Sequence, residues 1–311
     1  MQTELQRNTP GALKQQKGWR VWWQLTRPHT LTASFVPVIL GTVIALYHTP
    51  IDWILFIAML IASLLIQAAT NMFNEYYDYK RGLDHEGSVG IGGAIVRHGV
   101  KPKTVLNLGF ILFGLALLLG IYICINSSWW IAVVGLVSMA AAYLYTGGPI
   151  PIAYTPFGEL TSGFFMGCVI ILISYFIQTG EITTASIVIS VPISILIGAI
   201  LLSNNIRDLD GDKENGRKTL AILVGRKNAI RILAGMFIFS YAWIILMILL
   251  DYASIWLLVV FISVPIPIKA VKGFIGKTEP IQMMPAMKAT AQTNTIFGFL
   301  MSIGYIFGYI F

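Results

Sequence analysis

The chain has 311 residues, of which 56% are hydrophobic and only 11% are charged, and its mean hydropathy is +0.76. This composition excludes an ordinary soluble domain and predicts an integral membrane protein. The net charge of +7 is most simply explained by membrane topology and anionic lipid headgroups, together with an anionic substrate. No nucleic-acid-binding motif occurs, so we expect membrane lipid and no nucleic acid among the partners.

Apolar segments long enough to cross the hydrocarbon recur along the whole chain, and we predict an all-α, polytopic membrane protein with nine spans. The expected spans are 30–47, 53–73, 105–125, 129–146, 160–178, 185–205, 229–250, 253–270 and 290–311. Pro37 falls within the first and is expected to bend it. The cysteines, Cys124 and Cys168, lie in predicted spans without metal-like spacing, so we interpret them as packing residues.

All 21 Lys and Arg residues fall in alternate loops. Five precede the first span, five follow the second, seven lie between Arg207 and Arg231, and four lie between Lys269 and Lys288. By the positive-inside rule, the N-terminus is cytoplasmic and the C-terminus lies outside. We therefore expect a multi-pass protein of the cell membrane. Residues 1–28 would form a cytoplasmic segment with interfacial tryptophans, and residues 29–311 a single transmembrane domain.

Polar side chains gather directly after the second span, in the stretch NMFNEYYDYKRGLD. Asn71, Glu75 and Asp78 have helical i, i+4, i+7 spacing and share one helix face, with Asn74 beside them. Ionisable groups at the end of a membrane helix are costly to desolvate and usually mark a functional site. We interpret the cluster as the ligands of a divalent cation, with Lys80 and Arg81 next to it.

A second cluster follows the sixth span. Asn205, Asp208 and Asp212 have i, i+3, i+7 spacing, and hard oxygen ligands of this kind suit Mg²⁺, which also takes phosphate oxygens. Basic side chains lie beside the carboxylates, as expected for a site that binds a metal-bound diphosphate. These basic residues are Arg207, Lys213, Arg217 and Lys218. The two clusters lie at the ends of even-numbered spans, so both face the cytoplasm.

Two loops have unusual composition. The loop of residues 79–104 carries six glycines among its charges, and it is either a linker or a lid that brings Arg97 to a bound anion. The stretch YLYTGGPIPIAYTPFGEL, residues 143–160, has no Lys or Arg. Its Tyr145 and Tyr154 either line a substrate mouth with hydroxyl donors or anchor the chain at the membrane interface.

These stretches resemble the UbiA superfamily of membrane aromatic prenyltransferases. The likeness spans nearly the whole chain and is carried by TRPHTLTASFVPVILG, NMFNEYYDYKRGLD, YTGGPIPIAY..FGE and NNIRDLDGDKENGRKTLA. It is nearest to the branch that prenylates 1,4-dihydroxy-2-naphthoate. The resemblance implies a nine-helix bundle around a central cavity, Mg²⁺ as cofactor, and a polyprenyl diphosphate as donor. It also implies that the naphthoate loses its carboxylate as CO₂ and that a demethylmenaquinone is formed.

The predicted site combines the resemblance with the residue patterns. The catalytic residues are Asp78, Asp208, Asp212 and Tyr145. The metal ligands are Asn71, Asn74, Glu75, Asp78, Asp84, Asn205, Asp208 and Asp212. The diphosphate is expected to contact Asn74, Lys80, Arg81, Arg207, Lys213 and Lys218, and the aromatic acceptor to contact Arg97 and Tyr154.

The sequence departs from the superfamily in three places. Glu75 stands where many relatives have Asp, the interval from Asp78 to Asp84 is longer than usual, and Pro149 replaces a lysine that several relatives carry. Two alternatives stay open at this stage. One is a prenyltransferase for another aromatic acceptor, such as 4-hydroxybenzoate or homogentisate, and the other is a cation-coupled transporter, since carboxylates in membrane helices also mark ion paths.

Overall fold

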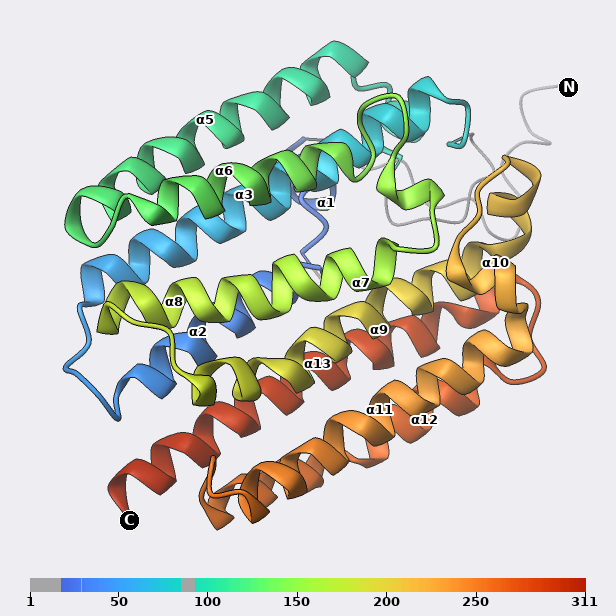
Figure 1. Cartoon of the computed structure of the whole chain (residues 1–311). Helices are drawn as coiled ribbons and strands as arrows, with labels where there is room; N and C mark the ends of the chain where they lie inside the picture. The colour runs from blue at the N-terminus through green and yellow to red at the C-terminus, as the bar shows by residue number, and fades with distance from the viewer. Residues whose placement is uncertain (1–17, 29, 85–92) are drawn as a thin grey trace, which may run out of the picture.

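The computed structural model describes residues 18–28, 30–84 and 93–311, and the segments with regular secondary structure in these ranges are all helical. The long helices run side by side in one bundle, and the C-terminus lies at one end of it (Figure 1). Most of the predicted cytoplasmic N-terminal segment and part of the glycine-rich loop, including Gly87, Gly90 and Gly92, lie outside the described residues.

The N-terminal part of the bundle has two short helices and four long ones. They are α1 (Trp19–Leu25), α2 (Thr32–Ala45), α3 (Trp53–Lys80), α4 (Ala94–His98), α5 (Pro102–Asn126) and α6 (Trp130–Leu144). α3 packs along α5 and also against α2 and α6. Phe73 of α3 is fully buried there and touches the rings of Phe110, Phe113 and Tyr143 from the two neighbouring helices.

The central part carries an irregular helix. Its elements are η2 (Ile152–Tyr154), α7 (Gly158–Ser162), the π-helix η3 (Gly163–Val169), α8 (Ile170–Thr179) and α9 (Thr184–Glu214). A methyl group on Gly167 would overlap the backbone of Ser194 in α9, and one on Gly41 of α2 would overlap the carbonyl group of Ile171 in α8. Glycine is therefore required at both positions, because the helices approach backbone to backbone there.

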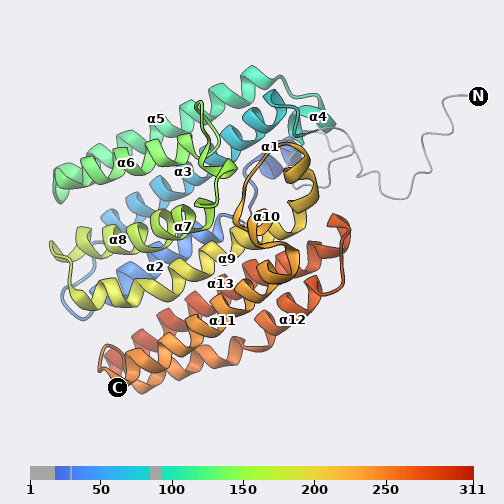
Figure 2. The ribbon, with the colours of Figure 1, turned by 45° about the vertical axis from the view of Figure 1, so that its right-hand side comes forward.

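The C-terminal part completes the bundle with α10 (Leu220–Val224), α11 (Arg226–Leu249), η4 (Ile255–Ser263), α12 (Pro265–Phe274) and α13 (Pro280–Ile310). The main hydrophobic core lies here, where α9 packs against α11 and α13, and α13 also packs against α2. Seen from the second direction, α2, α8 and α9 lie between the α3–α5–α6 group and the α11–α12–α13 group (Figure 2).

Within the described residues, seven helical segments are long and apolar enough to cross a membrane. The other two predicted spans correspond to Thr32–Ala45 and Trp130–Leu144, of 14 and 15 residues, which is short of the roughly 20 residues that a perpendicular crossing needs. The all-helical class is confirmed, and the count of nine spans is not. The second and sixth spans run on past their predicted ends to Lys80 and Glu214, so both acidic clusters lie on helices.

Candidate active site

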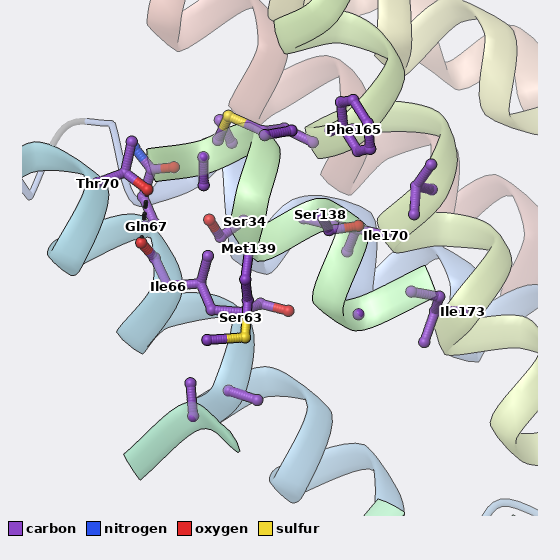
Figure 3. A pocket seen from close by; sticks show the side chains of 18 of the residues that line it. Ser34, Ser63, Ile66, Gln67, Thr70, Ser138, Met139, Phe165, Ile170 and Ile173 are labelled. Atoms are coloured by element: carbon purple, nitrogen blue, oxygen red, sulfur yellow. Dashed lines mark hydrogen bonds between the residues drawn. The ribbon is translucent and has the colours of Figure 1, made fainter. Parts of the chain in front are cut away.

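A cavity of ≈ 430 Å³ lies among α2, α3, α5, α6, α7, α8 and α9. Figure 3 shows side chains that line it, among them Ser63 and Ile66 of α3, Met139 of α6 and Phe165 of η3. Most of the wall is apolar. The polar groups gather toward one end, where Arg27, Asn74, Tyr145 and Asn204 line the cavity.

One face of α3 forms a wall along much of the cavity. Its lining residues recur with helical spacing: Met59, Ala62, Ser63, Ile66, Gln67, Thr70, Asn71 and Asn74. At a rise of 1.5 Å per residue, this face extends for about 22 Å along the helix axis. The cavity is therefore long and largely apolar, with polar side chains where it approaches the acidic motifs. Such a shape suits an extended lipid tail that carries a polar head.

Two of the predicted metal ligands are engaged elsewhere in the fold. Glu75 is 1% exposed, and its carboxylate accepts hydrogen bonds from the backbone N–H groups of Gly93 and Ile95 at the start of α4. Asn71 donates to the carbonyl oxygen of Thr26 and to Thr30, and it accepts from Gln67. These contacts tie α3 to α4 and to the segment before α2, so we leave both residues out of the ligand set proposed below.

Asp78 and Asp212 bring the two motifs together through a third residue. Arg217, just after α9, donates to Asp78 Oδ1 at 2.8 Å and lies 3.1 Å from Asp212 Oδ1. The side chain of Asp78 is only 19% exposed, that of Asp212 is 9% exposed and that of Arg217 is 14% exposed. Burial alone would lower the pKa of Arg217, but Asp78 and Asp212 raise it above its usual range. Arg217 therefore stays charged, and it joins the ends of α3 and α9.

The remaining acids of the second motif have partners of their own. Asp208 forms a bidentate pair with Arg207, which leaves the carboxylate more than a third exposed on its other side. Asn205 donates its amide N–H to Glu159 Oε1 at 2.8 Å. This bond assigns the amide orientation, so that Oδ1 of Asn205 remains the free acceptor. Glu159 thus orients a predicted metal ligand.

The basic and aromatic residues of the prediction divide into two groups. Arg81 donates to the carbonyl oxygens of Thr146 and Gly148, and its guanidinium lies over the ring of Tyr154 at 5.4 Å. Arg217 lies 5.0 Å from the centre of the same ring. Lys80, Lys213 and Lys218 are exposed at the same end of the bundle. The side chains of all three reach solvent, and none of them forms a hydrogen bond or ion pair with another of the described residues.

Asn74 and Tyr145 both line the polar end of the cavity, and Asn74 accepts a hydrogen bond from Thr146. Asp84 lies near the first motif, where burial, Asp78 and Glu75 raise its pKa to about 6. Arg97 lies on α4, which packs against α1 and α3, and it is not among the described residues that line the cavity. The cavity's polar end thus includes Tyr145 and Asn74, while neither Arg97 nor Tyr154 is among the described residues that line the cavity.

The donor chemistry of this end fits Mg²⁺. Among the described residues, no three His, Cys, Asp or Glu side chains converge closely enough to hold a metal ion by themselves. Mg²⁺ does not require such a group, because it is usually bound by one or two carboxylates, water and substrate phosphates. Asp212 Oδ2 is buried and has no hydrogen-bond partner, so one hard oxygen donor is already available. Asp78, Asp208 and Asp212 are the residues that would hold the ion.

A cluster of carboxylates and cations at one end of a long apolar cavity is the arrangement of a membrane enzyme that acts on a lipid with an anionic head. The chain belongs to the UbiA prenyltransferase family, which matches residues 34–309. It is 62% identical over 290 residues to the 1,4-dihydroxy-2-naphthoate octaprenyltransferase of Bacillus subtilis, covering 93% of each chain. It is 27% identical to the Escherichia coli protein of the same name, covering 89% of this chain and 94% of the relative.

Solved structures share the fold at low sequence identity. A UbiA homolog from Archaeoglobus fulgidus, bound to DMAPP and Mg²⁺, superposes with a TM-score of 0.62 at 14% identity and covers 91% of this chain and 99% of that one. The apo structure of a UbiA homolog from Aeropyrum pernix gives a TM-score of 0.65 at 14% identity, covering 91% and 98%. These likenesses establish the fold, and the family establishes that the protein is a prenyltransferase.

The sequence prediction missed two residues that organise this end of the bundle. Arg217 was noted beside the second motif but was not assigned to the site, because Lys and Arg there also serve as the topological signal. From the sequence, Glu159 is equally compatible with a carboxylate at a helix start and with a substrate contact. Its position one residue after Gly158, at the start of a predicted span, was the only signal. Their partners come from distant parts of the chain, and spacing alone does not reveal them.

Proposed function

We propose that this protein transfers a polyprenyl group from a polyprenyl diphosphate to 1,4-dihydroxy-2-naphthoate in a Mg²⁺-dependent reaction, with release of CO₂ and diphosphate. The product would be the reduced form of a demethylmenaquinone, a prenylated 1,4-naphthalenediol. The choice of 1,4-dihydroxy-2-naphthoate as acceptor is supported by the 62% identity, over 93% of both chains, to a relative named for this substrate. The family assignment weighs against the transporter alternative.

The cavity supports the donor half of the proposal. Its apolar wall, formed by residues such as Met59, Ile66 and Phe165, would hold the isoprenoid tail and exclude water from the allylic carbon. Exclusion matters because an allylic cation is hydrolysed readily, and a low-dielectric site also strengthens the interactions that ionise the diphosphate. The head of the donor would then lie at the polar end, near Asn74 and Tyr145.

The charged end supports the ionisation step. Asp78, Asp208 and Asp212 would hold Mg²⁺, and the bound ion would supply positive charge to stabilise the leaving diphosphate. Arg207 and the exposed Lys80, Lys213 and Lys218 would add charge-assisted hydrogen bonds to outer phosphate oxygens. The ring of Tyr145 at the cavity's polar end would favour positive charge on the allylic carbon by cation–π attraction.

The bond changes balance without an added reactant. The carbon–oxygen bond of the allylic diphosphate breaks, and its electron pair leaves with diphosphate. The electron-rich ring carbon that bears the carboxylate forms the new carbon–carbon bond. The carboxylate then departs as CO₂, and its electron pair returns to the ring. Arg97 and Tyr154 would guide the aromatic acid toward the cavity. The protein would lie in the cell membrane with its active site on the cytoplasmic side.

The test uses the purified protein in lipid with Mg²⁺, a prenyl diphosphate and carboxyl-labelled 1,4-dihydroxy-2-naphthoate. We expect labelled CO₂ and diphosphate in equal amounts, and a product mass equal to the decarboxylated naphthalenediol plus the prenyl group. 4-Hydroxybenzoate and homogentisate are expected to be poor acceptors. Label that stays in the lipid product, or faster reaction of 4-hydroxybenzoate, would show that the acceptor assignment is wrong.

A variant tests the acceptor contact. Arg97→Ala is expected to raise KM for the aromatic acid more than KM for the diphosphate, because it removes a guanidinium that would pair with the carboxylate. Arg226→Ala is the matched control, since Arg226 pairs with the exposed Asp210 outside the cavity. If Arg97→Ala raises KM mainly for the diphosphate, Arg97 belongs to the phosphate contacts instead.

A further inference from the structure

Arg217 pairs with a carboxylate from each of the two acidic clusters, although it belongs to neither predicted set of metal ligands. Its terminal nitrogens reach Asp78 at the end of α3 and Asp212 at the end of α9. Figure 2 shows α4 and α10, the helices that follow α3 and α9, at the same end of the bundle. The arginine therefore supplies the positive charge between two carboxylates that would otherwise repel one another.

The pairing of Arg217 with the two carboxylates leaves one hydrogen-bond donor and one acceptor without a partner. Arg217 Nε and Asp212 Oδ2 are both buried and have no hydrogen-bond partner. Buried polar groups without a partner cost free energy and are rare in folded proteins, so each calls for an explanation. A metal cation binds to an oxygen atom such as Asp212 Oδ2, and a phosphate oxygen accepts a hydrogen bond from an N–H group such as Arg217 Nε. A Mg²⁺–diphosphate complex would satisfy both atoms at once.

Backbone hydrogen bonds fix the chain around Arg217, which lies between the end of α9 and the start of α10. The N–H group of Arg217 donates to the carbonyl oxygen of Asp212, and the N–H group of Lys218 donates to that of Tyr154. Gly216 provides the positive φ of 75° that turns the chain out of α9. Rotation about the bonds of the Arg217 side chain can therefore move the guanidinium across the ring of Tyr154, which lies 5.0 Å from it, without moving the backbone.

We propose that Arg217 exchanges partners during the reaction cycle: it pairs with Asp78 and Asp212 until Mg²⁺ binds those carboxylates, and it then pairs with the diphosphate. The inference rests on the proposed function for its ligands, a divalent cation and a diphosphate, and not on the acceptor. The guanidinium competes with the metal for the same oxygens. The guanidinium and the metal can bind at the same time only when an anion such as diphosphate is present to pair with the guanidinium.

The exchange predicts opposite effects on two binding equilibria. Arg217→Ala should bind Mg²⁺ alone at least threefold more tightly than the unchanged protein, because the carboxylates lose their internal counter-ion and become unpaired buried charges. The same variant should bind inorganic pyrophosphate, titrated at saturating Mg²⁺, at least tenfold more weakly, because a charge-assisted contact is lost. Calorimetry of the full chain in detergent measures both affinities without turnover.

Two further variants make the result decisive. Arg226→Ala removes a nearby arginine that pairs with Asp210, and it should change neither affinity. Arg217→Lys keeps the charge but cannot span two carboxylates equally well, so it should show both effects with the same signs and smaller size, and it replaces the alanine variant if that one does not fold.

Unchanged or weaker Mg²⁺ binding in Arg217→Ala overturns the exchange, and so does unchanged pyrophosphate binding. Both measurements omit the aromatic acceptor. An enzyme that prenylates a different acceptor would therefore give the same binding results, and failure of the naphthoate assay would be distinguishable from failure of this inference.

Discussion

Glu75 provides a test of whether a carboxylate in the first motif binds metal or stabilises the fold. Its oxygens accept from Gly93 N at 2.8 and 2.9 Å and from Ile95 N at 3.2 Å, and Arg27 lies 3.7 Å away. Hydrogen bonds to a charged acceptor contribute about 1.5–3 kcal/mol each. In Glu75→Gln one oxygen becomes an amide donor, so we expect to lose roughly one such bond.

That loss corresponds to exchange that is roughly 10- to 150-fold faster for the amide protons of Gly93 and Ile95. Hydrogen exchange of the protein in detergent, followed by mass spectrometry of the peptide that begins α4, measures it. Mg²⁺ affinity, measured by calorimetry, should stay within threefold of the original value. Glu181→Gln is the matched control, because Glu181 is exposed.

The variant Asp78→Asn is expected to give the opposite result to Glu75→Gln in both measurements. Asp78 is expected to bind the metal, so this variant should weaken Mg²⁺ binding at least tenfold and leave exchange at Gly93 near its original rate. If Glu75→Gln instead weakens Mg²⁺ binding tenfold while exchange at Gly93 is unchanged, then Glu75 is a ligand and the structural role assigned to it is wrong.

Three further predictions concern the site, the topology and the cavity. Asp208→Ala should lower kcat at least tenfold, a barrier increase of roughly 1.4 kcal/mol or more, in a prenyl-transfer assay, and a smaller loss would remove Asp208 from the machinery. A cysteine at the exposed Lys103 should be labelled by an impermeant reagent from the cytoplasmic side only, and one at Asp251 from outside only; the reverse pattern would invert the topology. Ala62→Phe should reduce kcat/KM more for long prenyl diphosphates than for dimethylallyl diphosphate, because Ala62 lines the cavity. Ile57→Phe is its control, since Ile57 is exposed on the outer surface of α3, and equal loss for both donors in Ala62→Phe would contradict the cavity's role.

The fold was predictable because apolar segments of membrane length leave few choices other than helices. The helix ends were less predictable. Hydropathy falls at the first polar residues, but α3 and α9 continue through them to Lys80 and Glu214, since backbone hydrogen bonding does not stop where the side chains become polar. Two predicted spans are shorter than membrane length in the structure, where neighbouring loops take up part of the segment.

The site was predictable as a set of residue types and less so as a set of contacts. Helical spacing correctly places Asn71, Glu75 and Asp78 on one helix, but their partners come from elsewhere in the chain. Glu75 meets Gly93, and Asp78 meets Arg217, which is 139 positions away. Periodicity reports which side chains share a face, and it cannot report which distant group arrives to fill their hydrogen bonds.

The π-helix η3 makes one wall of the cavity depend on how a segment is wound as well as on its residues. A π-turn holds one residue more than the α-turn that it replaces. If Gly163–Val169 formed a regular α-helix with the same number of residues, everything that follows would be rotated by about 100° relative to α7, because the wider π-turn is what absorbs the extra residue. Ile170 and Ile173, which now line the cavity, would turn away from it. A change in how this one turn is wound would thus reshape the space for the lipid tail without altering any residue that lines it.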